Sequence, residues 1–124
     1  MTTAPHKVLV VDDTPANVKL LVDVLAAKGY DVRAAAHGEE ALALVEADPP
    51  DIVLLDGSRP WTPEFCQSIS AASSGKPVQT LLMLERANAR QLIDALAAGV
   101  DDFLQKPIVY GELLSRMRAA ARAL

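Results

Sequence analysis

The chain has 124 residues, 51% of them hydrophobic and 23% charged, which corresponds to about one folded domain with a sizeable core. Twelve basic and sixteen acidic residues give a formal net charge of −4, which argues against the phosphate attraction that drives nucleic-acid binding. The longest apolar run, residues 95–100, is much shorter than the roughly 20 residues of a membrane span, and the amino terminus lacks a signal-peptide core. We expect a cytoplasmic, single-domain protein over residues 1–124, with no membrane or direct nucleic-acid partner.

The first half of the chain alternates short apolar runs with helical periodicity. Residues 7–12 form a continuous apolar run ended by acids, which is typical of a strand buried on both faces. Thr14 and Pro15 are favourable first residues for a helix, and Gly29 supplies its stop. The sequence predicts three further elements in this half: a strand near 31–35, a helix over roughly 39–46 and a strand over 51–56.

The second half repeats the same alternation. The predicted elements are a helix over about 64–72, a strand over 78–84, a helix over 88–98, a strand over 102–105 and a helix from 110 to about 123. The helix over 88–98 places Leu92, Ile93 and Leu96 on one face, and the last helix uses Leu113, Leu114 and Met117. Cys66, the one cysteine, forms neither an internal disulfide nor a zinc framework, and we expect it to pack inside its helix.

Five strand–helix units in a chain of this length predict an open α/β sheet with helices on both faces. Right-handed crossovers make such a sheet parallel and doubly wound. Ligands bind beyond the carboxyl ends of the strands in these sheets, so the residues that directly follow the strands are the candidates for a site. These residues are Asp12, Asp13, Asp56, Leu84, Glu85, Lys106 and Pro107.

Three of these candidates are aspartates. If the first and third strands are neighbours, Asp12, Asp13 and Asp56 meet in a small volume, where they repel one another unless a cation intervenes. Mg²⁺ prefers carboxylate oxygens and water, and a carboxylate beside it can attack phosphorus to form an aspartyl-phosphate. Lys106 would then pair with a phosphoryl oxygen. Each residue also has an ordinary explanation, because the acids can cap helices or lie in solvated loops and Lys106 can be a surface lysine.

Three segments together resemble the receiver domain of bacterial two-component response regulators. They are Val-Leu-Val-Val-Asp-Asp at 8–13, Ile-Val-Leu-Leu-Asp at 52–56 with Pro60 four residues on, and Gly-Val-Asp-Asp-Phe-Leu-Gln-Lys-Pro at 99–107. The resemblance covers nearly the whole chain. It implies a flavodoxin-like, doubly wound α/β fold with five parallel strands in the order 2-1-3-4-5 and five helices.

The resemblance also implies roles for individual residues. Asp56 is implied to be the phosphoacceptor and Lys106 to contact its phosphoryl group, with a cis peptide bond following Lys106. Asp13, with Asp12 behind it, is implied to hold Mg²⁺ together with Asp56 and the backbone carbonyl of Ser58.

The switch positions depart from the family pattern. The family has a Ser or Thr at the end of strand four, which bonds the phosphoryl group and draws an aromatic residue inward. Here that place falls on Leu84, counting back from Lys106, or on Leu82, counting forward from Pro77, while Phe103 occupies the place of the aromatic. Losing one hydrogen bond to a charged group weakens the phosphorylated state by about 1.5–3 kcal/mol, or roughly tenfold to a hundredfold.

Two other departures flank the predicted site. Glu85 stands where a small residue is usual, and its carboxylate repels a phosphate if it faces the pocket. Trp61 lies in a proline-flanked loop, where it is either a partner-binding anchor or a ring folded over its own loop.

We therefore hypothesise a phosphorelay receiver that accepts a phosphoryl group on Asp56 with Mg²⁺ and changes a partner-binding surface, rather than a turnover enzyme. Its expected donor is a sensor histidine kinase or a phosphotransfer protein. The alternative is a phosphorylation-independent dimerisation or adaptor module, for which a homodimer is a natural partner and which Leu84, Glu85 and Trp61 favour. A small aspartate-nucleophile phosphatase is a third reading, which the lack of a cap domain disfavours.

Overall fold

The computed structural model describes residues 5–57, 63–85 and 89–124, in which strands and helices alternate along the chain. The strands are β1 (Lys7–Val11), β2 (Asp31–Ala35), β3 (Ile52–Asp56), β4 (Gln79–Leu84) and β5 (Asp102–Gln105). The helices are α1 (Pro15–Ala27), α2 (Gly38–Ala47), α3 (Pro63–Ala72), α4 (Ala89–Ala97) and α5 (Tyr110–Arg122). The boundaries predicted from sequence agree with these to within one or two residues.

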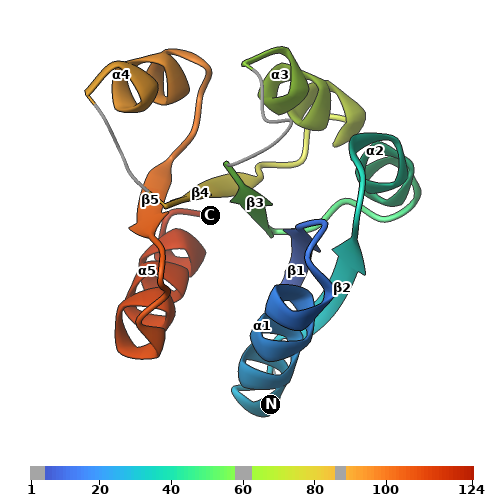
Figure 1. The fold of residues 1–124 in the computed structure, drawn as a ribbon. Helices are drawn as coiled ribbons and strands as arrows, with labels where there is room; N and C mark the ends of the chain where they lie inside the picture. The colour runs from blue at the N-terminus through green and yellow to red at the C-terminus, as the bar shows by residue number, and fades with distance from the viewer. Residues whose placement is uncertain (1–4, 58–62, 86–88) are drawn as a thin grey trace.

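All five strands belong to one parallel sheet in the order β2-β1-β3-β4-β5 (Figure 1). β3 lies centrally and is buried along its whole length, which is why its sequence is an unbroken apolar run. The predicted fold class and strand order are confirmed. Because the strands are parallel, their carboxyl ends all lie at the same edge of the sheet.

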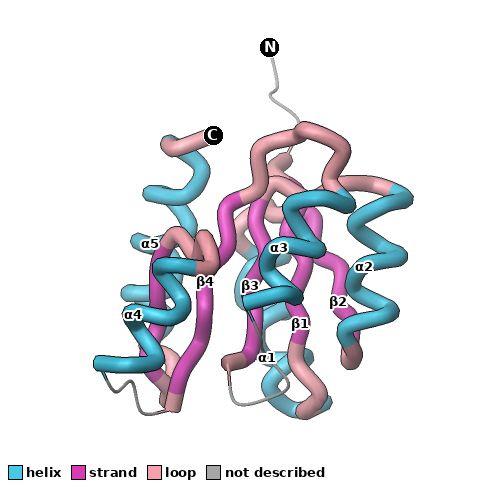
Figure 2. Tube along the Cα trace, turned by 90° about the horizontal axis from the view of Figure 1, so that it is seen from above, coloured by secondary structure: helices cyan, strands magenta, loops and turns pink. Residues whose placement is uncertain are grey.

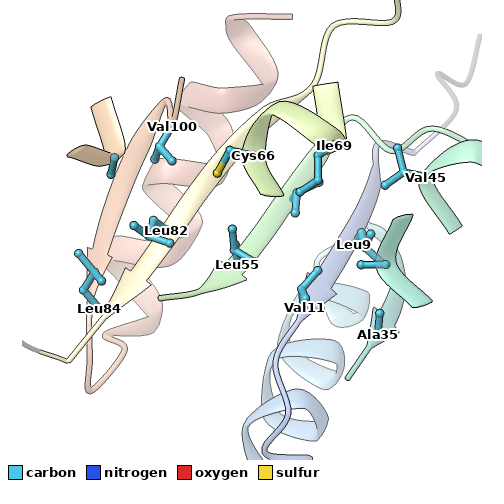
Figure 3. Close-up of a cluster of buried hydrophobic side chains, with 13 residues drawn as sticks. Leu9, Val11, Ala35, Val45, Leu55, Cys66, Ile69, Leu82, Leu84 and Val100 are labelled. Carbon is cyan, nitrogen blue, oxygen red and sulfur yellow. The ribbon is translucent and has the colours of Figure 1, made fainter. Parts of the chain in front are cut away.

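The helices cover both faces of the sheet, with α1 and α5 on one face and α2, α3 and α4 on the other (Figures 1 and 2). Each face has its own core. The first core joins even-numbered residues of β1 and β3, such as Val10 and Leu54, and odd-numbered residues of β4 to Leu25 of α1 and Met117 of α5. The second joins odd-numbered residues of β1 and β3 and even-numbered residues of β4 to Ile69 and Cys66 of α3 (Figure 3). This alternation follows from the two-residue period of a strand.

The turns that bound α1 lie where the sequence predicts. Thr14 is the N-cap residue in an extended conformation, although its side chain makes no capping hydrogen bond, and Pro15 is the first helical residue, where the missing N–H of proline costs no hydrogen bond. Gly29 follows the helix with a φ of 92°. That left-handed conformation suits glycine, because it has no Cβ to clash with the backbone.

The helix α4 differs from the expectation in which apolar residues it buries. Ala95 is fully buried and Leu92 packs partly against the core, whereas Ile93 and Leu96 are 65% and 58% exposed. The spacing groups Leu92, Ile93 and Leu96 on one face, but the structure turns the helix so that the small Ala95 faces the sheet. The position of α4 on the sheet, which no local pattern encodes, decides this orientation.

An ion-pair network joins segments at the amino-terminal edge of the sheet. Lys7 Nζ donates to Asp48 at 2.8 Å, the Lys7 backbone N–H donates to Asp51 at 2.8 Å, and Lys76 Nζ lies 3.2 Å from Asp51. The hydrogen bond from Lys7 lowers the pKa of Asp48. Burial opposes ionisation of Asp51, but its hydrogen bonds from Lys7 and Lys76 lower its pKa overall. Both carboxylates are thus stabilised in their charged form.

Candidate phosphoacceptor and cation site

The carboxyl ends of β1 and β3 bring Asp12, Asp13 and Asp56 together. Val11 pairs with Leu55 across the two strands, so the acids that follow emerge at the same level of the sheet. One carboxylate oxygen from each of the three residues lies within 4.8 Å of the others. Asp12 and Asp56 are 2% and 3% exposed, while Asp13 faces solvent. The cluster expected from the sequence therefore forms, with Asp12 behind Asp13.

Lys106 completes the cluster from the end of β5. Its Nζ donates to Asp56 Oδ1 at 2.9 Å and lies 3.8 Å from Asp12 Oδ2, and its side chain is 16% exposed. The cis peptide bond implied by the resemblance is present between Lys106 and Pro107. A lysine fifty residues from Asp56 in the chain is thus its hydrogen-bond partner.

The buried carboxylate of Asp12 indicates whether the carboxylate cluster suits a cation. Its Oδ1 accepts a hydrogen bond of 2.9 Å from the backbone N–H of Thr14, but its Oδ2 is buried without a hydrogen-bond partner. Such an orphaned acceptor costs free energy unless something compensates it. Three carboxylates and one ammonium have a formal charge of −3 + 1 = −2, and all the cluster's acceptor atoms are oxygens. The residues present therefore fit a hard divalent cation such as Mg²⁺.

A cavity of about 560 Å³ lies beside the cluster, and both Asp12 and Lys106 line it. Leu20 of α1 and Tyr110 of α5 form part of its wall. Glu85 lines the same cavity and is exposed. The carboxylate that the sequence analysis placed beside the site thus borders the space next to Lys106, where it adds negative charge.

The predicted switch positions both contact the interior. Leu84 is 4% exposed and belongs to the core shared with α3 and α4, against which the partly buried Phe103 packs. Leu82, the position reached by counting forward from Pro77, is fully buried in the same core. Thr80 lies near the opposite end of β4, paired with Val53, which confirms that its hydroxyl is too early in the strand to reach the cluster.

Two predicted residues, Ser58 and Trp61, lie outside the described residues, as does Pro60. One residue that sequence reasoning did not select is Gly57, which directly follows Asp56. A Cβ atom there would overlap with Leu84 Cδ2 and lie 2.9 Å from the carbonyl oxygen of Met83. The only sequence signal for this contact is a glycine next to the strand-end acid together with a large residue at 84.

Comparisons with known proteins agree with this geometry. Residues 8–118 match the response regulator receiver domain family. Response regulator MprA of Mycolicibacterium vanbaalenii is 38% identical over 120 residues, which cover 95% of this chain and 51% of the relative. The chain therefore spans about half the length of the curated relatives it matches.

Solved structures show the same architecture. The chemotaxis protein CheY4 of Vibrio cholerae superimposes with a TM-score of 0.85 at 26% identity, over 94% of this chain and 99% of that one. A two-component response regulator from Clostridium difficile has a TM-score of 0.86 over 94% of this chain and 96% of that one, and at 24% identity it supports the fold alone. Within the described parts of the chain, no helix has the length and apolar character needed to cross a bilayer. The chain belongs to the response regulator receiver domain family.

Proposed function

We propose that this receiver domain accepts a phosphoryl group on Asp56 while Mg²⁺ is held by Asp12, Asp13 and Asp56. The observation that carries the proposal is the cluster itself, in which three carboxylates lie within 4.8 Å and Lys106 is bound to Asp56 at 2.9 Å. The backbone carbonyl of Ser58 is a further proposed ligand, although that residue lies outside the described ranges.

The proposed reaction needs few groups. A carboxylate oxygen of Asp56 forms a bond to phosphorus, the bond between phosphorus and the donor's bridging oxygen or nitrogen breaks, and the donor group leaves with that electron pair. Mg²⁺, when bound, neutralises charge on the phosphoryl oxygens. Lys106 Nζ, now on Asp56 Oδ1, is placed to pair with a phosphoryl oxygen as the acyl phosphate forms. Positioning and charge neutralisation account for most of the catalysis of phosphoryl transfer.

The proposal extends to partners and setting. The family's receivers act with sensor kinases, so we propose a sensor histidine kinase or a phosphotransfer protein as the donor, in the cytoplasm. The protein is then an acceptor that carries one phosphoryl group, not an enzyme with turnover on a released substrate. In this proposal, residues 1–124 form a single receiver domain. A second copy of the chain is one partner for its binding surface, which gives a homodimer.

The alternative of a phosphorylation-independent adaptor rests on Leu84 and Glu85. Leu84 has no hydroxyl to bond a phosphoryl group, and Glu85 adds a carboxylate to the cavity that Lys106 lines. Trp61, the proposed partner anchor, lies outside the described residues. Against this alternative, all four residues that the acceptor chemistry requires are present and converge. The converged cluster favours the acceptor function.

Incubation with acetyl phosphate and Mg²⁺, followed by intact mass spectrometry, tests the proposal. We expect a species heavier by one phosphoryl group, which is lost in Asp56→Asn and in the presence of EDTA. Asp23→Asn is the matched control, because it removes one carboxylate from the exposed face of α1, where Asp23 pairs with Lys19. A modified species that persists in Asp56→Asn refutes the assignment, and no modification at all favours the adaptor function.

A further inference from the structure

The contact between Leu84 and Gly57 has no role in the phosphoryl transfer described above. Leu84 ends β4, and Gly57 directly follows the proposed acceptor at the end of β3. A Cβ atom at Gly57 would overlap with Leu84 Cδ2, would lie 2.9 Å from the Met83 carbonyl oxygen and would lie 3.2 Å from Leu82 Cδ1. The Leu84 side chain therefore covers the backbone of Gly57, in space that only glycine leaves open.

The backbone of Leu84 reaches the other half of the site. Its carbonyl oxygen accepts a hydrogen bond of 2.7 Å from the backbone N–H of Lys106. The Gly57 backbone N–H donates to the Met83 carbonyl oxygen at 2.8 Å, so β4 holds the chain on both sides of this point. Leu84 thus touches the residue after Asp56 with its side chain and Lys106 with its backbone.

The hydrophobic core also restrains the Leu84 side chain. Its side chain is 4% exposed and belongs to the core shared by β1, β3, β4, α3 and α4, and it lies at the tip of β4, beyond Leu82 (Figure 3). A close-packed core resists displacement of its members. The side chain that lies against Gly57 therefore has little freedom to move away.

Building on the proposed function, we propose that Leu84 is a positioning residue that sets the separation between Asp56 and Lys106 through its packing on Gly57. A polar site needs its ligands held to within about 0.5 Å by packed neighbours. Here an apolar contact supplies that constraint, and residue 57 must lack a side chain for it to form. The affinity of the cluster for Mg²⁺ then depends on Leu84 and Gly57 jointly, although neither side chain offers a ligand atom.

A double-mutant cycle on Mg²⁺ affinity, measured by isothermal titration calorimetry, tests this inference. The variants are Gly57→Ala, Leu84→Ala and the two combined, with urea unfolding used to confirm that each is folded. Gly57→Ala is expected to weaken Mg²⁺ binding about tenfold, as changes behind a metal ligand typically do. In the Leu84→Ala background, the factor by which Gly57→Ala weakens Mg²⁺ binding is expected to be smaller by at least about threefold. The overlap with Leu84 Cδ2 is then gone, while the Met83 carbonyl oxygen remains close. Leu84→Val, a smaller truncation, repeats the cycle if Leu84→Ala does not fold.

Two matched controls separate positioning from general loss of stability. Gly111→Ala places a Cβ in open space on α5, and Leu113→Ala truncates an equally buried leucine in the other core. Neither is expected to change Mg²⁺ affinity. The inference is overturned if Gly57→Ala has the same effect in both backgrounds, or if Leu113→Ala weakens Mg²⁺ binding as much as Leu84→Ala does.

Phosphorylation by acetyl phosphate, measured on the same variants, keeps the two proposals distinct. If the wild-type chain accepts no phosphoryl group while the coupling in Mg²⁺ affinity holds, the proposed function fails and the role of Leu84 stands. If the wild-type chain is phosphorylated but the effects on Mg²⁺ affinity are independent, the role of Leu84 fails and the proposed function stands.

Discussion

Replacing Asp12 by asparagine should stabilise the protein without Mg²⁺ and remove most of the stabilisation that Mg²⁺ provides. Asp12 is the least exposed member of the carboxylate cluster, and its Oδ2 has no hydrogen-bond partner. Asparagine keeps the shape of the side chain and the acceptor for the Thr14 N–H. It removes one negative charge and adds an N–H₂ donor beside the remaining carboxylates.

The size of the effect follows from the distances in the cluster. The carboxylate oxygens lie at most 4.8 Å apart, and two unit charges at that distance repel by about 3.5 kcal/mol at an effective dielectric constant of 20, which is the lower limit of the repulsion. The attraction between Asp12 Oδ2 and Lys106 Nζ at 3.8 Å is about 4.4 kcal/mol on the same scale, so it nearly cancels the repulsion from Asp56. What remains is repulsion from the exposed Asp13, reduced by solvent, and the cost of the orphaned oxygen, about 1–3 kcal/mol. We expect a net stabilisation of about 1–2 kcal/mol without Mg²⁺.

Urea unfolding with EDTA and with Mg²⁺ checks both halves of this prediction. At a free Mg²⁺ concentration about ten times its dissociation constant, the wild-type chain should gain about 1.4 kcal/mol, and Asp12→Asn should gain far less. Asp23→Asn changes the net charge equally at a side chain 61% exposed, and its stability should change by about 0.5 kcal/mol or less. An Asp12→Asn chain that is less stable than the wild type in EDTA would refute the charge reasoning.

Three other substitutions, and one control, have the following expected effects on the free energy of unfolding. Lys106→Met removes the ammonium group that pairs with the buried carboxylates of Asp12 and Asp56, so unfolding in EDTA should become easier by about 3 kcal/mol, and Mg²⁺ should restore part of that loss. The pKa of Asp51 is lowered in the folded chain. The stability that its carboxylate contributes is therefore present above about pH 4 and is lost as the pH falls through the folded pKa. In Asp51→Asn, the midpoint of urea unfolding should depend less on pH between about pH 6 and pH 2. Met117→Ala empties a fully buried position and should cost about 2–5 kcal/mol, whereas Leu96→Ala, at 58% exposure, should change the urea midpoint little.

The sequence by itself determined the order and type of the elements. The apolar runs of β1 and β3, the Thr14-Pro15 start of α1 and the Gly29 stop are local signals, and each depends on residues within a few positions of one another. The parallel sheet follows from that alternation, because helices must cross between successive parallel strands. The acids after β1 and β3 could be selected for the same reason, since every parallel strand ends at one edge.

Only the tertiary structure decided which groups touch. The hydrogen bond between Lys106 and Asp56 spans fifty residues, and the orphaned oxygen of Asp12 exists because surrounding segments bury it. The exposure of Ile93 and Leu96 depends on how α4 is rotated against the sheet, and the overlap of Leu84 with any side chain at residue 57 depends on the register of β3 and β4. Burial and contact are properties of packed neighbours that are distant in sequence, so a local pattern can identify the residues of a site but not the distances between them.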